Sequence, residues 1–242
     1  MNLTSEQEAQ VLSYITTQPN LDPLYDVGYH ESKIARAQAF NPEFSRAEAW
    51  SLSMYLGPSY YCSGINRTLL KMSMPVEEKA KFEVIAEAAK IALSKVPSVT
   101  NEMLSNLPQP DARLPPAQYL KRFVYYPQEV LDSYEVGKVK REPNFSSTTF
   151  WQAPVGQMKQ YAEKANTVFH VHVLSKQSWG QYIDQTKRSA REGEVLFPPG
   201  TDFQVTEKGT SRYPIDTAGN EQKQMNIINL QEVKRNVDER EL

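Results

Sequence analysis

The sequence contains one cysteine, no long apolar run and almost no net charge. Cys62 cannot form a disulfide within the chain, and we expect it to be a small buried residue. No segment approaches the length of a membrane span, and the polar start MNLTSEQEAQ lacks the apolar centre of a signal peptide. The formal net charge of -2 gives no general attraction to nucleic acid.

The amino-acid content is that of an ordinary globular protein, with 40% hydrophobic and 23% charged residues. The first hundred residues have helical periodicity. Ser5 to Glu8 fits a capping box, and residues 44–56 repeat apolar positions at helical spacing. A further amphipathic helix is predicted between Pro75 and Pro97.

The composition changes at the proline-rich stretch 106–117, NLPQPDARLPPA, which is typical of a connector. Beyond it, strand patterns dominate and one short helix is predicted at 155–165. The strands are expected at 119–126, 133–141, 168–174, 194–197, 201–208 and 223–233. Helices followed by strands predict an α+β fold with an antiparallel sheet. We therefore expect one domain over 1–242, with a helical lobe at 1–106 and a β-rich core at 107–242.

Two basic or titratable features lie inside predicted strands. His170 and His172 alternate, which places both rings on one face, but no further ligand follows at metal spacing. The polar face of a strand is the favoured interpretation, and no metal is expected. Arg122 lies in an apolar strand, where an arginine usually points to solvent and Lys121 must point to the opposite face. An arginine turned into a cleft would instead offer planar donors to phosphates.

The stretch REGEVLFPPGTDF places Glu192 and Glu194 on either side of one glycine. If both lie on an extended strand, period two puts the two carboxylates on the same face. A solvated strand start, neutralised by Arg188 and Arg191, is the alternative that composition alone favours.

The order of these elements carries a resemblance. An arginine strand is followed by a hydroxyl-rich strand, FSSTTF at 145–150, and then by Glu-x-Glu before VLFPPGTDFQV. This arrangement resembles the mono-ADP-ribosyltransferase family, in its arginine–serine–glutamate class of bacterial toxins and effectors. The stretch MYLGPSYYCSGINRTL, 54–69, is similar to the family's helix that ends in Asn-x-x-Leu.

The resemblance implies a two-sheet β core with a helical lobe, and a cleft that binds NAD+ as the substrate. Arg122 matches the arginine that contacts the dinucleotide phosphates, although Phe123 stands where the family often has glycine. Ser147, Thr148 and Thr149 match the Ser-Thr-Ser motif, whose first hydroxyl holds the glutamate and the ribose. Phe145 or Phe150 is implied as a contact of the nicotinamide ring.

Glu194 matches the family's catalytic glutamate. Breaking the bond from ribose to nicotinamide builds positive charge on the sugar, which a carboxylate bound to the 2′-hydroxyl stabilises. Glu192 matches the glutamate that marks arginine-modifying members, since a carboxylate can hold and orient a guanidinium. Residues 175–192 match the turn that recognises the target protein, with contacts expected from Trp179, Tyr182, Lys187 and Arg188.

Three functions remain open at this stage. The first, which the resemblance favours, is transfer of ADP-ribose from NAD+ to an exposed arginine of a target protein, with release of nicotinamide. The second is hydrolysis of NAD+ on the same fold, with water as the acceptor. The third is a binding module without catalysis, in which the glutamates are a solvated edge. We expect a monomer with no nucleic-acid partner, secreted or delivered into a host cell.

Overall fold

A computed structural model describes residues 2–17, 27–57, 60–183, 193–216 and 218–234. The chain forms two compact units, of which the first extends to Pro97 and the second holds the described residues from Ser98 onward. The short helix α6 (Asn101–Asn106) belongs to the second unit, so the change of unit precedes the proline-rich connector.

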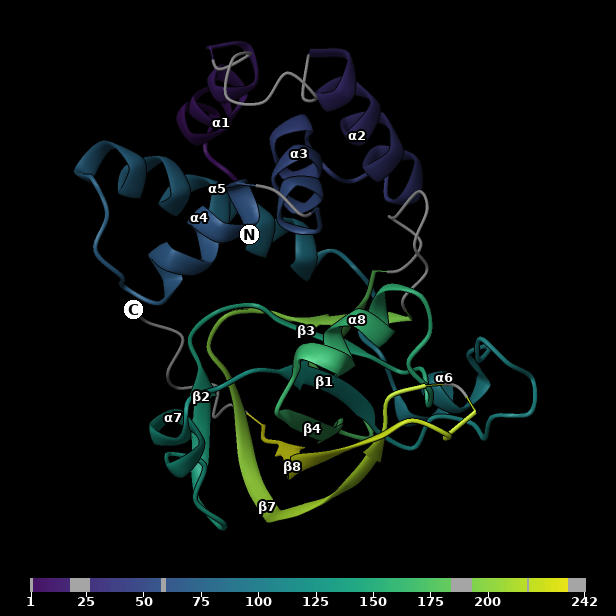
Figure 1. Cartoon of the computed structure of the whole chain (residues 1–242). Coiled ribbons are helices and arrows are strands. Elements are labelled where there is room, and N and C mark those ends of the chain that lie inside the picture. The colour runs from purple at the N-terminus through teal and green to yellow at the C-terminus, as the bar shows by residue number, and fades with distance from the viewer. Residues whose placement is uncertain (1, 18–26, 58–59, 184–192, 217, 235–242) are drawn as a thin grey trace. The chain divides into compact units, whose positions relative to one another are not determined.

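The first unit is helical, as the sequence predicts, and its helices are shown in purple and blue in Figure 1. α5 begins directly after Pro75, as expected. The capping box of the first helix is displaced by one residue, because Thr4 and Gln7 exchange hydrogen bonds of 3.2 and 2.9 Å. The helices are α1 (Ser5–Thr17), α2 (Val27–Phe40), α3 (Arg46–Tyr55), α4 (Tyr60–Leu69) and α5 (Val76–Ser94).

Aromatic side chains fill the interior of the helical unit. Trp50 is fully buried and donates from Nε1 to Nδ1 of His30 over 3.0 Å. Gly64 of α4 allows the ring of Phe82 on α5 to approach closely, since a Cβ on this glycine would lie 2.1 Å from the ring. Cys62 is half-buried rather than buried, because it lies off the buried stripe of α4.

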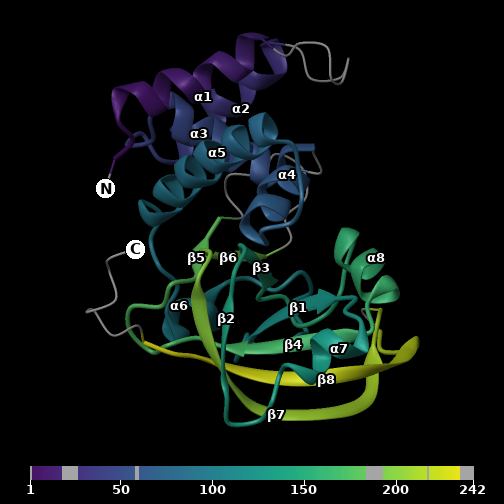
Figure 2. The same ribbon diagram turned by 90° about the vertical axis from the view of Figure 1, so that its left-hand side faces the viewer.

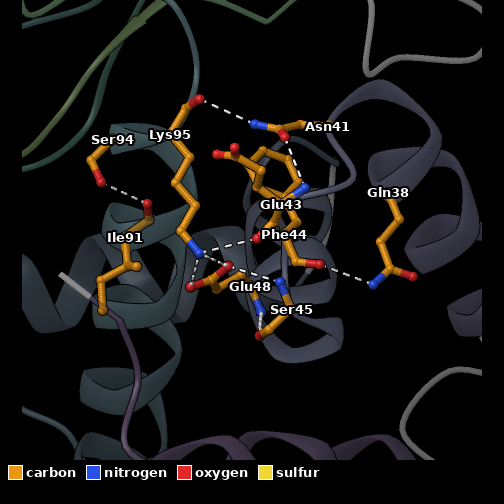
Figure 3. A network of polar contacts seen from close by, with 9 residues as sticks. All are labelled: Gln38, Asn41, Glu43, Phe44, Ser45, Glu48, Ile91, Ser94 and Lys95. Atoms are coloured by element: carbon orange, nitrogen blue, oxygen red, sulfur yellow. Dashed lines mark hydrogen bonds and ion pairs between the residues drawn. The ribbon is translucent and has the colours of Figure 1, made fainter.

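A buried ion pair joins α3 to the end of α5 (Figure 3). Both carboxylate oxygens of Glu48 accept from Nζ of Lys95, at 2.8 and 2.7 Å, and the Glu48 side chain is 1% exposed. Glu48 also closes the capping box of α3 with Ser45. The lysine further donates to the carbonyl of Glu43 over 3.1 Å, so its ammonium is held by the Glu48 carboxylate and by a backbone carbonyl.

The second unit holds the strands and, among its described residues, three short helices. The predicted strand at 133–141 is wrong over most of its length, because Gly137 takes a φ of +85° and the strand begins only at Val139. The two-residue strand β5 and the helix α7 were not predicted. The elements are β1 (Leu120–Val124), α7 (Gln128–Asp132), β2 (Val139–Glu142), β3 (Ser146–Thr149), α8 (Gln157–Lys164), β4 (Thr167–His172), β5 (Gln181–Tyr182), β6 (Glu194–Phe197), β7 (Thr201–Pro214) and β8 (Gln222–Glu232).

Hydrogen bonds link the described strands into one sheet of order β2-β7-β8-β4-β1-β3-β6-β5. The sheet is mostly antiparallel as expected, but β4 and β8 pair in parallel. The block β3-β6-β5 joins the rest through β1, whose register with β3 rests on the single pair Lys121↔Thr149. The expected division of the β core into two sheets therefore corresponds to two strand blocks joined at this point. Figure 2 shows β7 and β8 as long curved strands lying side by side.

One apolar core serves both strand blocks. Phe169 and Ile228 from the larger block and Val195 and Phe197 from the smaller block belong to the same buried cluster. The strands of the smaller block are therefore fixed by packing as well as by their hydrogen bonds. No helix in the described residues is both long and apolar enough to cross a membrane.

Candidate active site

The central contact of the candidate site joins Ser147 on β3 to Glu194 on β6. The Ser147 hydroxyl donates to Oε1 of Glu194 over 2.5 Å. The two strands are neighbours, with Thr149 opposite Glu194 and Ser147 opposite Leu196. The glutamate residue is only 4% exposed, whereas Ser147 is exposed. The Glu194 carboxylate is therefore mostly buried, and the exposed Ser147 hydroxyl fixes one of its oxygens.

Three of the four hydroxyls of β3, those of Ser147, Thr148 and Thr149, make three different contacts. Ser147 bonds the carboxylate, and Thr148 donates to the carbonyl of Val195 over 2.7 Å. Thr149 accepts from the backbone N–H of Trp151 over 3.1 Å. Thr148 and Thr149 therefore fix the neighbouring strand and the turn that follows, and Ser147 has the direct contact with Glu194.

Arg122 on β1 does not point to solvent, since its side chain is 15% exposed. Its Nη1 donates to the hydroxyl of Ser146 over 2.8 Å and lies 3.4 Å from Oε2 of Glu142. Ser146 directly precedes Ser147, so the guanidinium is anchored next to the strand position that holds the glutamate.

Glu142 links the arginine to a buried tyrosine. The Tyr134 hydroxyl donates to Oε1 of Glu142 over 2.5 Å, and Glu142 itself is buried. Burial, followed by the charge of Glu142, raises the pKa of Tyr134 above its usual value. The tyrosine therefore stays a neutral donor, and the carboxylate that orients Arg122 is itself held at both oxygens.

Lys121 points away from Arg122, as the alternation of a strand requires. Its ammonium donates to the carbonyl of Gln152 over 2.7 Å and lies 5.7 and 5.4 Å from the ring centres of Tyr119 and Tyr213. Lys121 is 5% exposed, and burial lowers its pKa to about 8. This buried cation was not singled out from the sequence.

The two alternating histidines lie on the same side as this lysine. His170 is opposite Lys121 in the register of β1 and β4. Burial, followed by the charge of Lys121, lowers the pKa of His170 to about 4, and burial also lowers that of His172. The two rings contact Tyr119 at 4.3 and 5.6 Å between centroids. The preferred interpretation as the polar face of a strand is confirmed, with the correction that this face is largely covered.

The sequence analysis placed Glu192 and Glu194 on one face on the condition that both lie on an extended strand. The residue between them, Gly193, does not meet that condition. β6 begins at Glu194, and Gly193 has a φ of +60°, which is not the conformation of an extended strand. Glu192 lies outside the described residues, as do Arg188, Arg191 and Lys187. Strand alternation therefore does not extend back across Gly193.

The aromatic residues expected to contact NAD+ or a target protein differ in how deeply they are buried. Phe145 and Phe150 are both 1% exposed, and Phe150 belongs to the apolar core. Phe123, in the position after the arginine, packs edge-to-face with Tyr213 at 5.9 Å between centroids. In the turn expected to recognise a target, Trp179 and Tyr182 are partly buried against the core.

No cluster of three His, Cys, Asp or Glu side chains that could hold a metal is present in the described part of the chain. Residues that the sequence analysis missed include Glu142 and Trp151, which contact Arg122 and Gly193 respectively. The sequence did contain a sign of the irregular backbone at Gly193, because an isolated glycine in a strand pattern often marks a bulge or a close approach of two backbones. Glu142 gave no such signal, since its partners are distant in sequence.

A family model described as ADP-ribosyltransferase exoenzyme matches residues 31–235. A comparison with curated protein sequences found no significant match.

Solved structures resemble this chain in fold. The type III effector XopAI from Xanthomonas axonopodis pv. citri matches with a TM-score of 0.64 and 16% identity, covering 96% of this chain and 85% of XopAI. Vis toxin, an ADP-ribosyltransferase from Vibrio splendidus, matches with a TM-score of 0.54 and 16% identity, over 99% of this chain and 91% of Vis. One Vis structure is in complex with agmatine.

A third match is to a longer protein. The enzymatic component C2-I of the C2-toxin from Clostridium botulinum matches with a TM-score of 0.55 and 17% identity, over 87% of this chain. This chain spans 48% of that C2-I chain. At these identities the three structures establish a common fold.

Proposed function

The chain belongs to the ADP-ribosyltransferase exoenzyme family, and we propose that it transfers ADP-ribose from NAD+ to arginine side chains of a target protein, with release of nicotinamide. The observation that carries this proposal is the hydrogen bond from Ser147 to Glu194 between neighbouring strands. The ADP-ribosyltransferase family predicted from the sequence is confirmed, while membership of its arginine–serine–glutamate class is part of the proposal; the fold is shared with Vis toxin, an ADP-ribosyltransferase.

In the proposed reaction, Glu194 acts on the sugar of NAD+. As the bond to nicotinamide breaks, positive charge develops on the ribose, and a carboxylate that accepts from the 2′-hydroxyl stabilises it. The Ser147 hydroxyl fixes Oε1 in advance, so less reorganisation accompanies bond breaking. Interactions that strengthen in the transition state raise kcat, and we assign this role to Glu194.

Arg122 is the proposed contact for the NAD+ phosphates. A guanidinium is planar, always charged and suited to paired hydrogen bonds with phosphate oxygens. Ser146 and Glu142 hold this one through Nη1, which fixes the plane of the group before the ligand arrives. The remaining proposed contacts with NAD+ come from Phe123, Thr148 and Thr149. A nicotinamide contact from Phe145 or Phe150 would require the ring to become accessible on binding.

Glu192 is the proposed acceptor-binding residue. A carboxylate there would pair with the guanidinium of the target arginine and aim one nitrogen at the anomeric carbon. This role rests on the sequence motif, since Glu192 is outside the described residues. Agmatine is a suitable small acceptor because it carries the same guanidinium, and Vis has been crystallised with it.

The proposed biological setting is that of a bacterial toxin or effector that acts on a host protein. XopAI is described as a type III effector, and C2-I is the enzymatic component of a toxin. The same fold in those proteins supports secretion or delivery for this chain.

The test is an incubation of the protein with labelled NAD+ and agmatine, with wild type, Glu194→Gln and Glu192→Ala in parallel. Labelled agmatine is expected with wild type, and both labelling and nicotinamide release are expected to fall to a small but measurable residual rate with Glu194→Gln. Glu192→Ala is expected to lose transfer and retain some hydrolysis of NAD+. Thermal unfolding of each variant controls for loss of fold.

Each other outcome points to a different function. Free ADP-ribose without labelled agmatine would support NAD+ hydrolysis or an acceptor other than arginine. Equal loss of both activities in Glu192→Ala would overturn the division of roles between the two glutamates. No nicotinamide release by wild type, and no NAD+ binding by calorimetry, would leave the binding module as the remaining function.

A further inference from the structure

The strand that carries Glu194 is preceded by a sharp backbone turn. Gly193 has a φ of +60°, in the left-handed region that residues with a side chain rarely adopt. β6 begins at the next residue. The direction of the backbone therefore changes immediately before the carboxylate of the candidate site.

The indole of Trp151 occupies the space beside this glycine. A Cβ on Gly193 would lie 2.6 Å from Cδ1 and 2.7 Å from Nε1 of Trp151, which is closer than real carbon atoms approach. Glycine is thus required at this position for two separate reasons, its conformation and its lack of a side chain. The contact also means that the ring cannot move toward Gly193.

One hydrogen bond ties this turn to the residue after β3, and a second orders the backbone at Trp151 itself. The backbone N–H of Phe150 donates to the carbonyl of Gly193 over 2.9 Å. The N–H of Trp151 donates to the Thr149 hydroxyl over 3.1 Å, and Thr149 is opposite Glu194 in the register. The strand that carries Ser147 and the turn that precedes Glu194 are therefore joined by the residues directly after β3.

Side chains of Gln109 and Lys121 bind the backbone of the residues on either side of Trp151. The N–H of Gln152 donates to Oε1 of Gln109 over 2.8 Å, and its carbonyl accepts from Lys121 over 2.7 Å. Gln109 also donates to the carbonyl of Phe150 over 3.2 Å. The peptide on each side of the indole is thus anchored, and the ring is a fixed support for Gly193.

We propose that Trp151 and Gly193 form a positioning pair for Glu194. The indole holds the left-handed turn in place, and the turn sets where the Glu194 carboxylate lies relative to the Ser147 hydroxyl. Neither residue is assigned a contact with the substrate. This inference rests on the proposed function for its effect on rate, since a displaced carboxylate stabilises the developing charge less well.

The kinetic test compares nicotinamide release from NAD+ by Trp151→Ala, Trp151→Phe and Gly193→Ala. Trp151→Ala and Gly193→Ala are expected to lower kcat about ten- to hundredfold, because a misplacement on the order of 1 Å has this effect on a catalytic group. The KM for NAD+ is expected to change far less than kcat. Trp151→Phe keeps a flat ring against the glycine and is expected to retain most of the activity.

Gly137→Ala is the matched control. Gly137 also has a positive φ, +85°, but nothing lies within 4 Å of the Cβ it would gain. This variant imposes a similar backbone strain away from Trp151, and we expect wild-type kcat. Wild-type kcat in Trp151→Ala, or a loss confined to KM, would overturn the positioning role, the latter because it would indicate a direct contact with NAD+.

The double variant tests the contact itself. Removing the indole relieves the clash but not the backbone strain, so Gly193→Ala is expected to lower kcat by a smaller factor in the Trp151→Ala background than in wild type. Full additivity of the two effects would show that the residues act independently and would overturn the pair.

Amide hydrogen exchange without NAD+ provides a readout that does not depend on activity. The Phe150 amide, which donates to Gly193, and the amides of β6 are expected to exchange faster in Trp151→Ala and Gly193→Ala than in wild type or Gly137→Ala. If wild type releases no nicotinamide, the proposed function fails while this experiment still decides the structural role. Unchanged exchange in both variants would then overturn the positioning pair.

Discussion

Replacing Ser147 with alanine is a direct test of the contact at the centre of the candidate site. The hydroxyl donates to Oε1 of Glu194 over 2.5 Å, and the substitution removes only this oxygen. A hydrogen bond to a charged group contributes about 1.5–3 kcal/mol, and each ~1.4 kcal/mol of transition-state stabilisation changes a rate about tenfold. Because Ser147 is exposed, water can take the place of the hydroxyl, which favours the lower part of this range. We therefore expect kcat for nicotinamide release to fall about ten- to thirtyfold.

The assay is nicotinamide release under saturating NAD+, followed by a titration of NAD+ for KM. The fall in kcat is expected to exceed any rise in KM, because the hydroxyl orients the carboxylate that acts in the transition state. The effect should also depend on Glu194. In the Glu194→Gln background, Ser147→Ala is expected to have little further effect, since the charged acceptor of the bond is already gone.

Thr206→Ala is the control for this prediction. Thr206 also lies on a strand and donates to a carbonyl, that of Asn229, over 3.2 Å. Its removal is expected to leave kcat unchanged. A Ser147→Ala variant with kcat within twofold of wild type, or with a loss of the same size in the Glu194→Gln background, would refute the reasoning.

Three further predictions concern stability. Lys95→Met leaves the Glu48 charge buried without its partner and is expected to lower the free energy of unfolding by about 3–5 kcal/mol, measured by urea denaturation. Gly64→Ala is expected to destabilise by about 1–3 kcal/mol, because the clash with Phe82 outweighs the better helix propensity of alanine. The pKa of Lys121 is about 8 in the folded state, against 10.5 in the unfolded chain, so the unfolded state binds more protons between these values. Stability is therefore expected to rise with pH from about 8 to about 9.5, below the range in which tyrosines of the unfolded chain ionise, and Lys121→Met should reduce this slope.

Each stability prediction has a control in the same chain. Lys79→Met breaks an exposed pair at 3.8 Å from Glu83 and is expected to cost less than about 1 kcal/mol. Gly209→Ala adds a methyl group with nothing within 4 Å and is expected to be neutral or slightly stabilising. Lys208→Met removes an exposed lysine that also donates to a carbonyl, and the pH slope should persist. A wild-type pH slope in Lys121→Met, or stability losses equal to those of the controls, would contradict the corresponding argument.

The sequence predicted the long elements well because their periodicity is local. α5 and β6 follow the expected ranges, since apolar spacing and flanking prolines determine where each begins and ends. The two-residue strand β5 had no pattern to detect and exists through its pairing with β6. The parallel pairing of β4 and β8 was also not predictable, because it depends on which distant strand each one meets.

In the candidate site too, residues in short motifs could be identified from the sequence, whereas their arrangement in space could not. Ser147 and Glu194 were selected from short motifs, and the structure brings their side chains together. The alignment of Glu192 with Glu194 was inferred from strand alternation, and the positive φ of Gly193 invalidates that inference. Alternation applies only where the backbone is extended, and the glycine in the motif was the local sign that it is not.

Arg122 and Lys121 show why the orientation of the basic residues required the structure. Alternation predicted correctly that the two side chains leave β1 on opposite faces. The general tendency of a strand arginine to point to solvent, which was one of two orientations left open for Arg122, assumes that one face of β1 is open. β1 lies inside the sheet between β4 and β3, and side chains distant in sequence cover both faces at this point. Arg122 therefore meets Glu142 and Ser146, while Lys121 meets Gln152 and a tyrosine pair, and neither set of partners could be identified before the strand order was known.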